Sequence, residues 1–314
     1  MTQLANDRAG VRAAPHLGGG LLLALLSAGT FGMSGALARG LLESGWSPGA
    51  VVLARLSVGA LALAPFALIA LRGRWRLLRA QTRPVLIYGG LGMAGTQFCY
   101  FSAVSTMDVA PALLIEFTAP VAIVGWLWLR RGQRPTALTL LGAASAIAGL
   151  VFALDLASGA GVAWAGAAWA FAAMIGNAAY FLISGETEGV LPPITLAGVG
   201  LALSAGILAL LGAIGILPMH ASSAPAAYAI GGTPWWAPVV ALGVLSAAVA
   251  YATGTAATRR LGSRLASFVA LTEVLASALF AWALLDQRPG VAVVLGGVLI
   301  IGGVVLVRLG DRSA

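Results

Sequence analysis

Two stretches of this sequence align without a gap at an offset of 154 residues: WLRRGQRPTALTLLGAASAIAGLV (128–151) and WALLDQRPGVAVVLGGVLIIGGVV (282–305). Their identities include the first tryptophan, two glycines and the tripeptide Gln-Arg-Pro, at 133–135 and again at 287–289. Apolar segments match by chance, but apolar composition alone does not generate an identical polar tripeptide. The chain therefore contains an internal repeat.

The composition identifies the environment of both copies. Of the 314 residues, 60% are hydrophobic and 9% charged, and the mean hydropathy is +0.97, which excludes a water-soluble fold. A bilayer span needs about 20 mainly apolar residues. The sequence predicts an all-α integral membrane protein with ten transmembrane helices, at 17–38, 48–71, 84–104, 109–129, 137–154, 162–184, 193–216, 237–258, 265–285 and 290–307.

The repeat divides these spans into two five-helix units. We expect an N-terminal tail at 1–16, a first repeat at 17–154, a second repeat at 162–308 and a C-terminal tail at 309–314. Five is an odd number, so the two repeats must insert with opposite topology. Inverted repeats of this kind are typical of transporters that work by alternating access, with the binding site near the bilayer midplane.

The charged residues predict the orientation. All 18 basic residues are arginines, and fifteen of them fall on one side of the ten-span arrangement. By the positive-inside rule that side is the cytoplasm, so both termini are predicted to be cytoplasmic and the protein is placed in the inner membrane. The net charge of +8 is thus explained by topology and not by nucleic-acid binding. The sequence specifies no oligomeric state.

Three segments resemble a known family: ALLIEFTAPVAIVGWLWLRRGQRPT (112–136), its counterpart ASFVALTEVLASALFAWALLDQRPG (266–290) and LARLSVGALAL (53–63). The chain resembles the ten-span, two-EamA-domain group of the drug/metabolite transporter superfamily. The EFTAP run also resembles amino-acid exporters of the threonine and homoserine type. This resemblance implies a basket of ten helices that exports small organic solutes, commonly amino acids. The family's Glu-Pro pair of the ninth span is replaced here by Glu273-Val274.

Three ionisable residues fall inside the predicted spans: Arg55, Glu116 and Glu273. A charge at bilayer depth costs at least about 2.5 kcal/mol, so such residues usually face a cavity or a partner. Arg55 and Glu116 lie at similar depth, roughly 10 to 12 Å from the outer ends of their helices, and could reach each other. Two interpretations stay open for them: a neutralised pair that fixes two helices, or a substrate-binding or gating role.

Glu116 and Glu273 are the proton-coupling candidates. Pro120 removes the helical partner of the Glu116 carbonyl and predicts a kinked fourth helix, which either lines the path or is a packing kink. Glu273 lies near the midplane, where a lone carboxylate is a natural proton carrier. The alternative is a facilitator with a structural glutamate.

Polar and aromatic residues supply further substrate-binding candidates. Trp169, Asn177 and Tyr180 recur at helical spacing on the sixth span. Rings with a few polar groups suit an amphipathic organic solute, and Gln97, Tyr100 and Tyr251 add contacts from the third and eighth spans. Packing is the alternative role for each of them.

The motifs leave a transporter as the leading function. No catalytic constellation, metal set or phosphate-binding loop occurs, so we expect neither an enzyme nor a cofactor or metal. The predicted function is secondary transport that exports small amphipathic metabolites, with amino acids leading and proton coupling as a hypothesis. The expected partners are the solute, the bilayer and protons. The alternatives are a broad drug or organic-cation exporter, an uncoupled facilitator and an intramembrane enzyme.

Overall fold

A computed structural model describes residues 14–73, 75–119, 121–122, 125, 128–129, 132, 135–153, 163–184 and 191–310. This part of the chain is helical and contains no β-strand beyond one isolated bridge between Ala226 and Thr233. Its α-helices are α2 (Ala14–Glu43), α3 (Pro48–Leu71), α4 (Trp75–Ala80), α5 (Thr82–Ile87), α6 (Thr96–Val104), α7 (Val109–Glu116), α9 (Ala137–Ala153), α10 (Trp164–Ser184), α11 (Pro193–Ala213), α12 (Trp236–Gly243), α13 (Ala250–Ala270), α14 (Thr272–Leu285) and α15 (Val291–Gly310). Two π-helices, η1 (Tyr88–Gly95) and η2 (Val244–Val249), interrupt the series.

The prediction of an all-helical membrane protein is confirmed. Within the described ranges four helical stretches are long and apolar enough to cross a membrane: Gly18–Glu43, Pro48–Leu71, Pro193–Ala213 and Trp236–Ala257. Three shorter apolar helices accompany them: Ala137–Phe152, Thr272–Leu285 and Val291–Val307. The total of ten spans stays a prediction.

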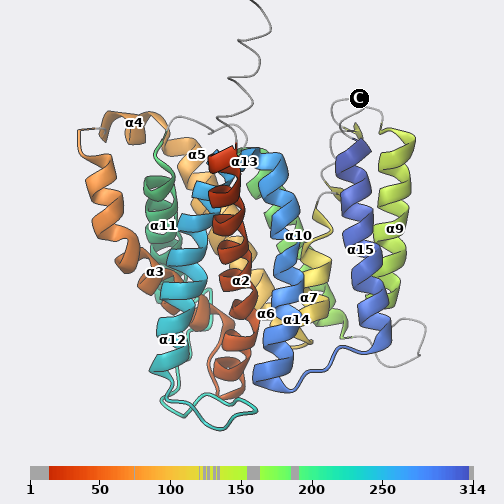
Figure 1. Cartoon of the computed structure of the whole chain (residues 1–314). Helices are drawn as coiled ribbons and strands as arrows, with labels where there is room; N and C mark the ends of the chain where they lie inside the picture. The colour runs from red at the N-terminus through yellow and green to blue at the C-terminus, as the bar shows by residue number, and fades with distance from the viewer. Residues whose placement is uncertain are drawn as a thin grey trace, which may run out of the picture.

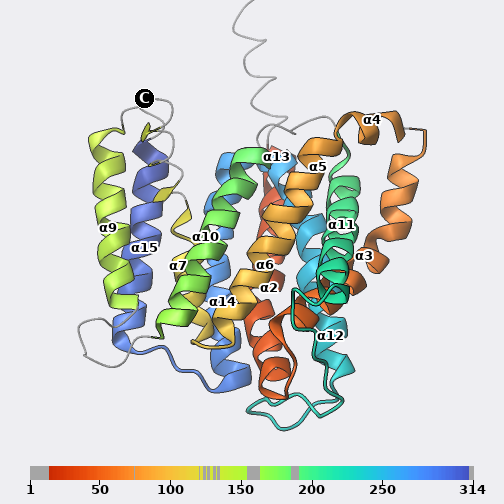
Figure 2. The ribbon, with the colours of Figure 1, turned by 180° about the vertical axis from the view of Figure 1, so that it is seen from behind.

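The helices stand side by side in an elongated bundle (Figures 1 and 2). The α9/α15 pair forms one edge, α3 and α11 lie toward the other, and α2, α6, α10 and α14 lie between. The start of α2, the end of α15 and the arginine-bearing helix α4 lie at one end of the bundle, here named the arginine-rich end. The connection between α11 and α12 covers the opposite end, here named the loop end (Figure 1).

Glycines bring α9 and α15 into close backbone contact. A Cβ on Gly142 would lie 2.5 Å from the carbonyl oxygen of Gly303, and the reverse holds for Gly303. A Cβ on Gly149 would lie 2.6 Å from the carbonyl oxygen of Gly296, and the Ser145 hydroxyl donates to the Leu299 carbonyl at 2.9 Å. Small residues allow this approach where no hydrophobic driving force acts between helices.

We therefore expect Gly303→Ala to destabilise the protein. The added methyl group meets backbone atoms of α9, which cannot rotate away, and such overpacking costs about 1–3 kcal/mol. The adjacent Gly302 is a matched control, because no atom lies within 4 Å of its Cβ position. Thermal unfolding in detergent should show a lower melting temperature than the wild type for Gly303→Ala. Gly302→Ala should not lower it. Equal melting temperatures would contradict this packing.

Two π-helices free backbone carbonyls in the predicted third and eighth spans. The wider turn of a π-helix breaks the regular pattern of hydrogen bonds, and such segments are frequent at functional sites. In η1 the Gly89 carbonyl accepts a hydrogen bond from the Ser204 hydroxyl at 2.7 Å. In η2 the Ser246 carbonyl accepts one from Arg55 at 2.6 Å. Each π-helix is thus tied to a helix outside its own span.

Two predicted boundaries differ from the structure. The predicted connection at 259–264 is part of α13, which runs to Ala270, and α14 begins at Thr272 instead of 265. The sequence holds no proline between Pro238 and Pro289, so nothing enforces an early helix end. In the fourth span α7 ends at Glu116, and a turn follows at residues 117–118. The predicted kink residue Pro120 lies outside the described residues.

A strap, residues 217–235, covers the loop end. Its backbone pairs with three helix ends: Ser47 N–H donates to His220 at 2.9 Å, Ala227 N–H to Gly40 at 3.0 Å, and Ala229 N–H to Leu284 at 2.7 Å. The Tyr228 hydroxyl donates to the Leu37 carbonyl at 2.7 Å. The strap therefore joins α2, α3 and α14 at the loop end.

The Tyr228 bond predicts an alkaline sensitivity. Burial raises the pKa of Tyr228 above its ordinary value of about 10, so the unfolded chain ionises first as the pH rises. The stabilisation is complete below about pH 10 and is lost above it. Tyr228→Phe should lower stability by about 1 kcal/mol near neutral pH and flatten the loss above pH 10, as measured by unfolding across the pH range. Identical alkaline curves for both proteins would contradict this.

Candidate functional site

Arg55 lies at the centre of the bundle and joins three helical segments. It projects from α3 and is 1% exposed. Its Nη1 donates to the Oε1 atom of Gln97 on α6, and its Nη2 donates to the Ser246 carbonyl of η2. The guanidinium carbon lies 6.0 Å from the ring centroid of Phe31 and 5.4 Å from that of Phe101, within cation–π range.

The suggested ion pair between Arg55 and Glu116 is not formed. The salt bridges among the described residues are Arg39–Glu43 and Arg288–Asp286, both at helix ends. The Gln97 side-chain oxygen and the Ser246 carbonyl of η2 accept the guanidinium's hydrogen bonds instead, because they lie within hydrogen-bond distance of it. The Arg55 Nε atom is fully enclosed and has no partner in the described part of the chain.

Glu116 and Glu273 lie near Arg55 without contacting it. Both carboxylates interact electrostatically with the guanidinium and with each other. Glu116 ends α7 and is 8% exposed, and Glu273 is half-buried in the first turn of α14. No described residue donates a hydrogen bond to either carboxylate, yet neither is among the enclosed atoms that lack a partner. Both carboxylates therefore border accessible space.

Aromatic side chains surround these charges. Tyr100 on α6 is buried, and its hydroxyl lies against Gly35 of α2. It interacts electrostatically with both carboxylates and lies beside Ser277 of α14. The Tyr251 ring packs edge to face on Phe31 at a centroid distance of 4.8 Å. The structure thus groups Gln97, Tyr100 and Tyr251 with the three ionisable residues, and we name these six residues the central cluster.

Of three further candidates, Trp169 and Asn177 make no described contact with the central cluster. Trp169 is 40% exposed and packs edge to face on Phe98, at a centroid distance of 5.6 Å. Asn177 is half-buried on α10, beside a glycine that packs on Thr96. Tyr180 lies in α10, but its side chain is outside the described residues.

Sequence reasoning missed the partners of Arg55. Ser246 acts through its carbonyl, so its residue type carries no signal. Phe31 and Phe101 are ordinary apolar residues of their spans, and only their contact with the guanidinium distinguishes them. No group of three His, Cys, Asp or Glu that suits a metal is present among the described residues.

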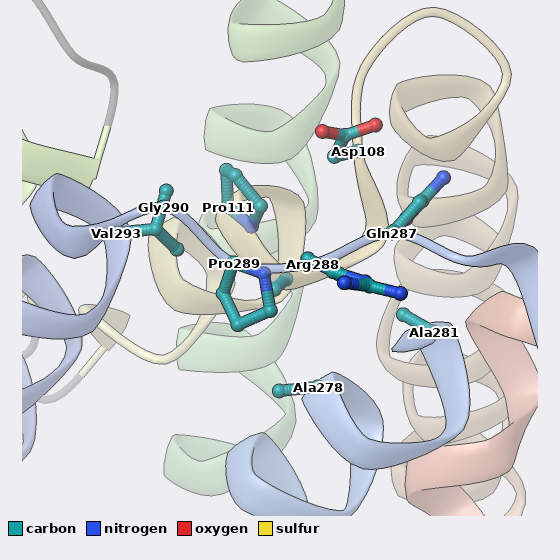
Figure 3. A pocket seen from close by; sticks show the side chains of 10 residues that line it. Asp108, Pro111, Ala278, Ala281, Gln287, Arg288, Pro289, Gly290 and Val293 are labelled. Carbon is teal, nitrogen blue, oxygen red and sulfur yellow. The ribbon is translucent and has the colours of Figure 1, made fainter. Parts of the chain in front are cut away.

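A pocket lies between the start of α7 and the link from α14 to α15 (Figure 3). Asp108, Gln287 and Arg288 are its polar lining. The Val109 N–H donates to Gln287 Oε1 at 3.4 Å, so the glutamine of the repeated tripeptide caps α7. Glu116 lies seven residues beyond Val109 on α7, which is about 10 Å. The pocket and the central cluster therefore share one helix.

The fold and the central cluster define a class of protein. A helical membrane bundle holds one arginine and two carboxylates among aromatic rings, and intramembrane ionisable groups of this kind are typical of transport pathways. The sequence model of the EamA-like transporter family matches residues 18–154 and again 164–309. The chain therefore belongs to the EamA-like transporter family, within the drug/metabolite transporter superfamily, and carries the domain in two copies.

Relatives and a solved structure agree with this membership. The chain is 30% identical to the threonine/homoserine exporter RhtA of Salmonella typhimurium, strains SL1344 and LT2, over 197 residues. This match covers 62% of the chain and 62% of the relative, less than two thirds of either. A solved structure described only as "Crystal structure of protein" superposes with a TM-score of 0.63, at 24% identity, over 93% of this chain and 98% of its own. Both the family's description and the relatives' names are those of transporters.

Proposed function

We propose that this protein is a secondary transporter that exports small amphipathic metabolites, above all amino acids, across the inner membrane by alternating access. The central cluster carries this proposal, because both repeats contribute to it. Arg55 and Glu116 come from the first repeat, and Tyr251 and Glu273 from the second. A solute bound there touches both halves of a protein whose halves rock against each other.

Two structural pairings support an inverted repeat of residues 17–154 and 162–308. The offset of 154 relates Gly142 to Gly296 and Gly149 to Gly303. Gly142 packs on Gly303 and Gly149 on Gly296, so each copy makes the same contact with the other, as a two-fold axis requires. The two π-helices also occur at the same place in each proposed half. Ten spans with both termini in the cytoplasm complete the proposed topology.

The amino-acid substrate is supported by the RhtA relatives, which are threonine/homoserine exporters. Proton coupling is supported by the two carboxylates without hydrogen-bond donors, since a proton or a substrate ammonium group can neutralise each of them. In this mechanism protonation of Glu273 accompanies release of the substrate.

Transport by the purified protein in liposomes tests this function. The assay measures uptake of labelled threonine, homoserine and other amino acids, with and without an imposed pH gradient, beside liposomes without protein. We expect uptake of at least one amino acid that the gradient accelerates. Uptake that is equal with and without the gradient would rule out proton coupling, and no uptake of any amino acid would rule out the proposed substrate.

A second candidate function is export of organic cations. The ratio of two carboxylates to one arginine favours it, because the central cluster carries a net negative charge whenever both carboxylates are ionised. It predicts that a cationic dye such as ethidium competes with amino-acid uptake, whereas a site specific for zwitterions is insensitive to the dye.

A further inference from the structure

We propose that Glu116 and Glu273 together form an ammonium-binding subsite and that Arg55 is a fixed internal cation, not the ligand of the substrate's carboxylate. This inference deepens the proposed function and rests on it for the location of the site. It assigns the positively charged group of a substrate to two named side chains.

Arg55 is unavailable to a solute. Two of its nitrogens are engaged by Gln97 and the Ser246 carbonyl, and the third, Nε, has no accessible surface. Rings of Phe31 and Phe101 lie near the guanidinium. Arg55 as a whole is 1% exposed, so a substrate carboxylate would reach its remaining N–H groups only if the residues around it moved. A buried charge that loses its hydrogen bonds is strongly disfavoured, so the guanidinium stays where it is.

The two carboxylates, unlike Arg55, lack hydrogen-bond partners and border accessible space. Glu116 is more than nine-tenths buried, has no hydrogen-bond donor among the described residues and still borders accessible space. Glu273 shares these last two properties and interacts electrostatically with Glu116. A carboxylate is an acceptor only, and an ammonium group offers three donors and a charge. A primary ammonium ion thus offers these carboxylates the hydrogen-bond donors that no described residue gives them.

The net charge of the central cluster also favours a ligand with a positive charge. While both carboxylates are ionised, the central cluster with its one arginine carries a charge of minus one. A cationic amine restores neutrality by itself, and a zwitterion needs one additional positive charge. The proposed subsite therefore ranks ligands by whether they keep their amine, and places little weight on their carboxylate.

A ligand series on the unmodified protein tests this assignment. The probes are threonine, threonine methyl ester, which keeps the ammonium group alone, N-acetylthreonine, which keeps the carboxylate alone, and propylammonium. Binding in detergent is read as a shift of the melting temperature at fixed pH, because a ligand that binds the native state stabilises it. We expect the ammonium probes to raise the melting temperature, the ester at least as much as threonine does. N-acetylthreonine should leave it unchanged.

Two results of the ligand series would overturn the subsite. Binding of N-acetylthreonine would show that a cationic group of the protein binds the substrate's carboxylate, and absence of binding by both ammonium probes would leave the carboxylates without a role. Glu116→Gln and Glu273→Gln should each weaken ester binding roughly tenfold or more, and Asp286→Asn, an exposed carboxylate at the loop end, should not. Failure of threonine transport with intact ester binding would reject the proposed function alone.

Discussion

Glu273→Gln is expected to abolish the acceleration of amino-acid transport by a pH gradient while the protein stays folded. Glutamine has nearly the same shape as glutamate but binds no proton in this range and offers no negative charge. The Glu273 carboxylate accepts no hydrogen bond from the described residues, so its loss breaks no bond that holds the fold. Loss of an ionic contact to a substrate ammonium group removes about 1.5–3 kcal/mol, which is about tenfold or more in affinity.

Liposomes with equal amounts of wild type and variant provide the measurement. The initial rate of threonine uptake is followed with and without the gradient, and the melting temperature confirms folding. Asp286→Asn is the matched control, since it makes the same chemical change at an exposed residue whose left-handed backbone, φ 53°, suits asparagine. A variant that still responds to the gradient would make Glu273 structural and direct attention to Glu116.

Arg55→Met is expected to cause the largest loss of stability. It leaves the Gln97 oxygen and the Ser246 carbonyl without their donor and removes the counter-charge of two carboxylates. Removing one partner of a buried charged network costs about 3–5 kcal/mol. Arg55→Lys keeps the charge, but a single ammonium group does not reproduce the forked geometry that reaches both acceptors, so we expect an intermediate loss.

Thermal unfolding in detergent ranks these variants. Arg288→Met is the control, because Arg288 is mainly exposed and its pair with Asp286, at 3.3 Å, is of the surface kind that contributes 0 to about 1 kcal/mol. An Arg55→Met protein as stable as the control would show that the network around η2 does not hold the two repeats together.

Helix positions were predictable because hydropathy and proline mark them along the chain. The predicted span at 48–71 coincides with α3, and α11 begins at the predicted Pro193. The turn after α13 was misplaced because no proline ends that helix. Spacing therefore predicts length and depth better than it predicts a helix end.

The central cluster was only partly predictable. Depth along a helix follows from counting residues, and Arg55 and Glu116, which counting places deep in their helices, are both buried. Rotation about the helix axis does not follow from counting, so the Gln97 contact replaced the expected ion pair. The carbonyl of Ser246 is free because η2 widens, and no residue type encodes that. Trp169 shows the same limit, since its helical stripe does not specify which face meets the bundle.

The close pairing of α9 with α15 has a consequence for biosynthesis. The helix that carries Gly142 leaves the ribosome 154 residues before its repeat equivalent in α15. At 5–20 residues per second this delay is roughly 8 to 30 s. During that time the glycine face of α9 has no permanent partner and is open to lipid, to the insertion machinery or to another nascent chain. The order of synthesis thus makes the last helix the one that completes the edge of the bundle.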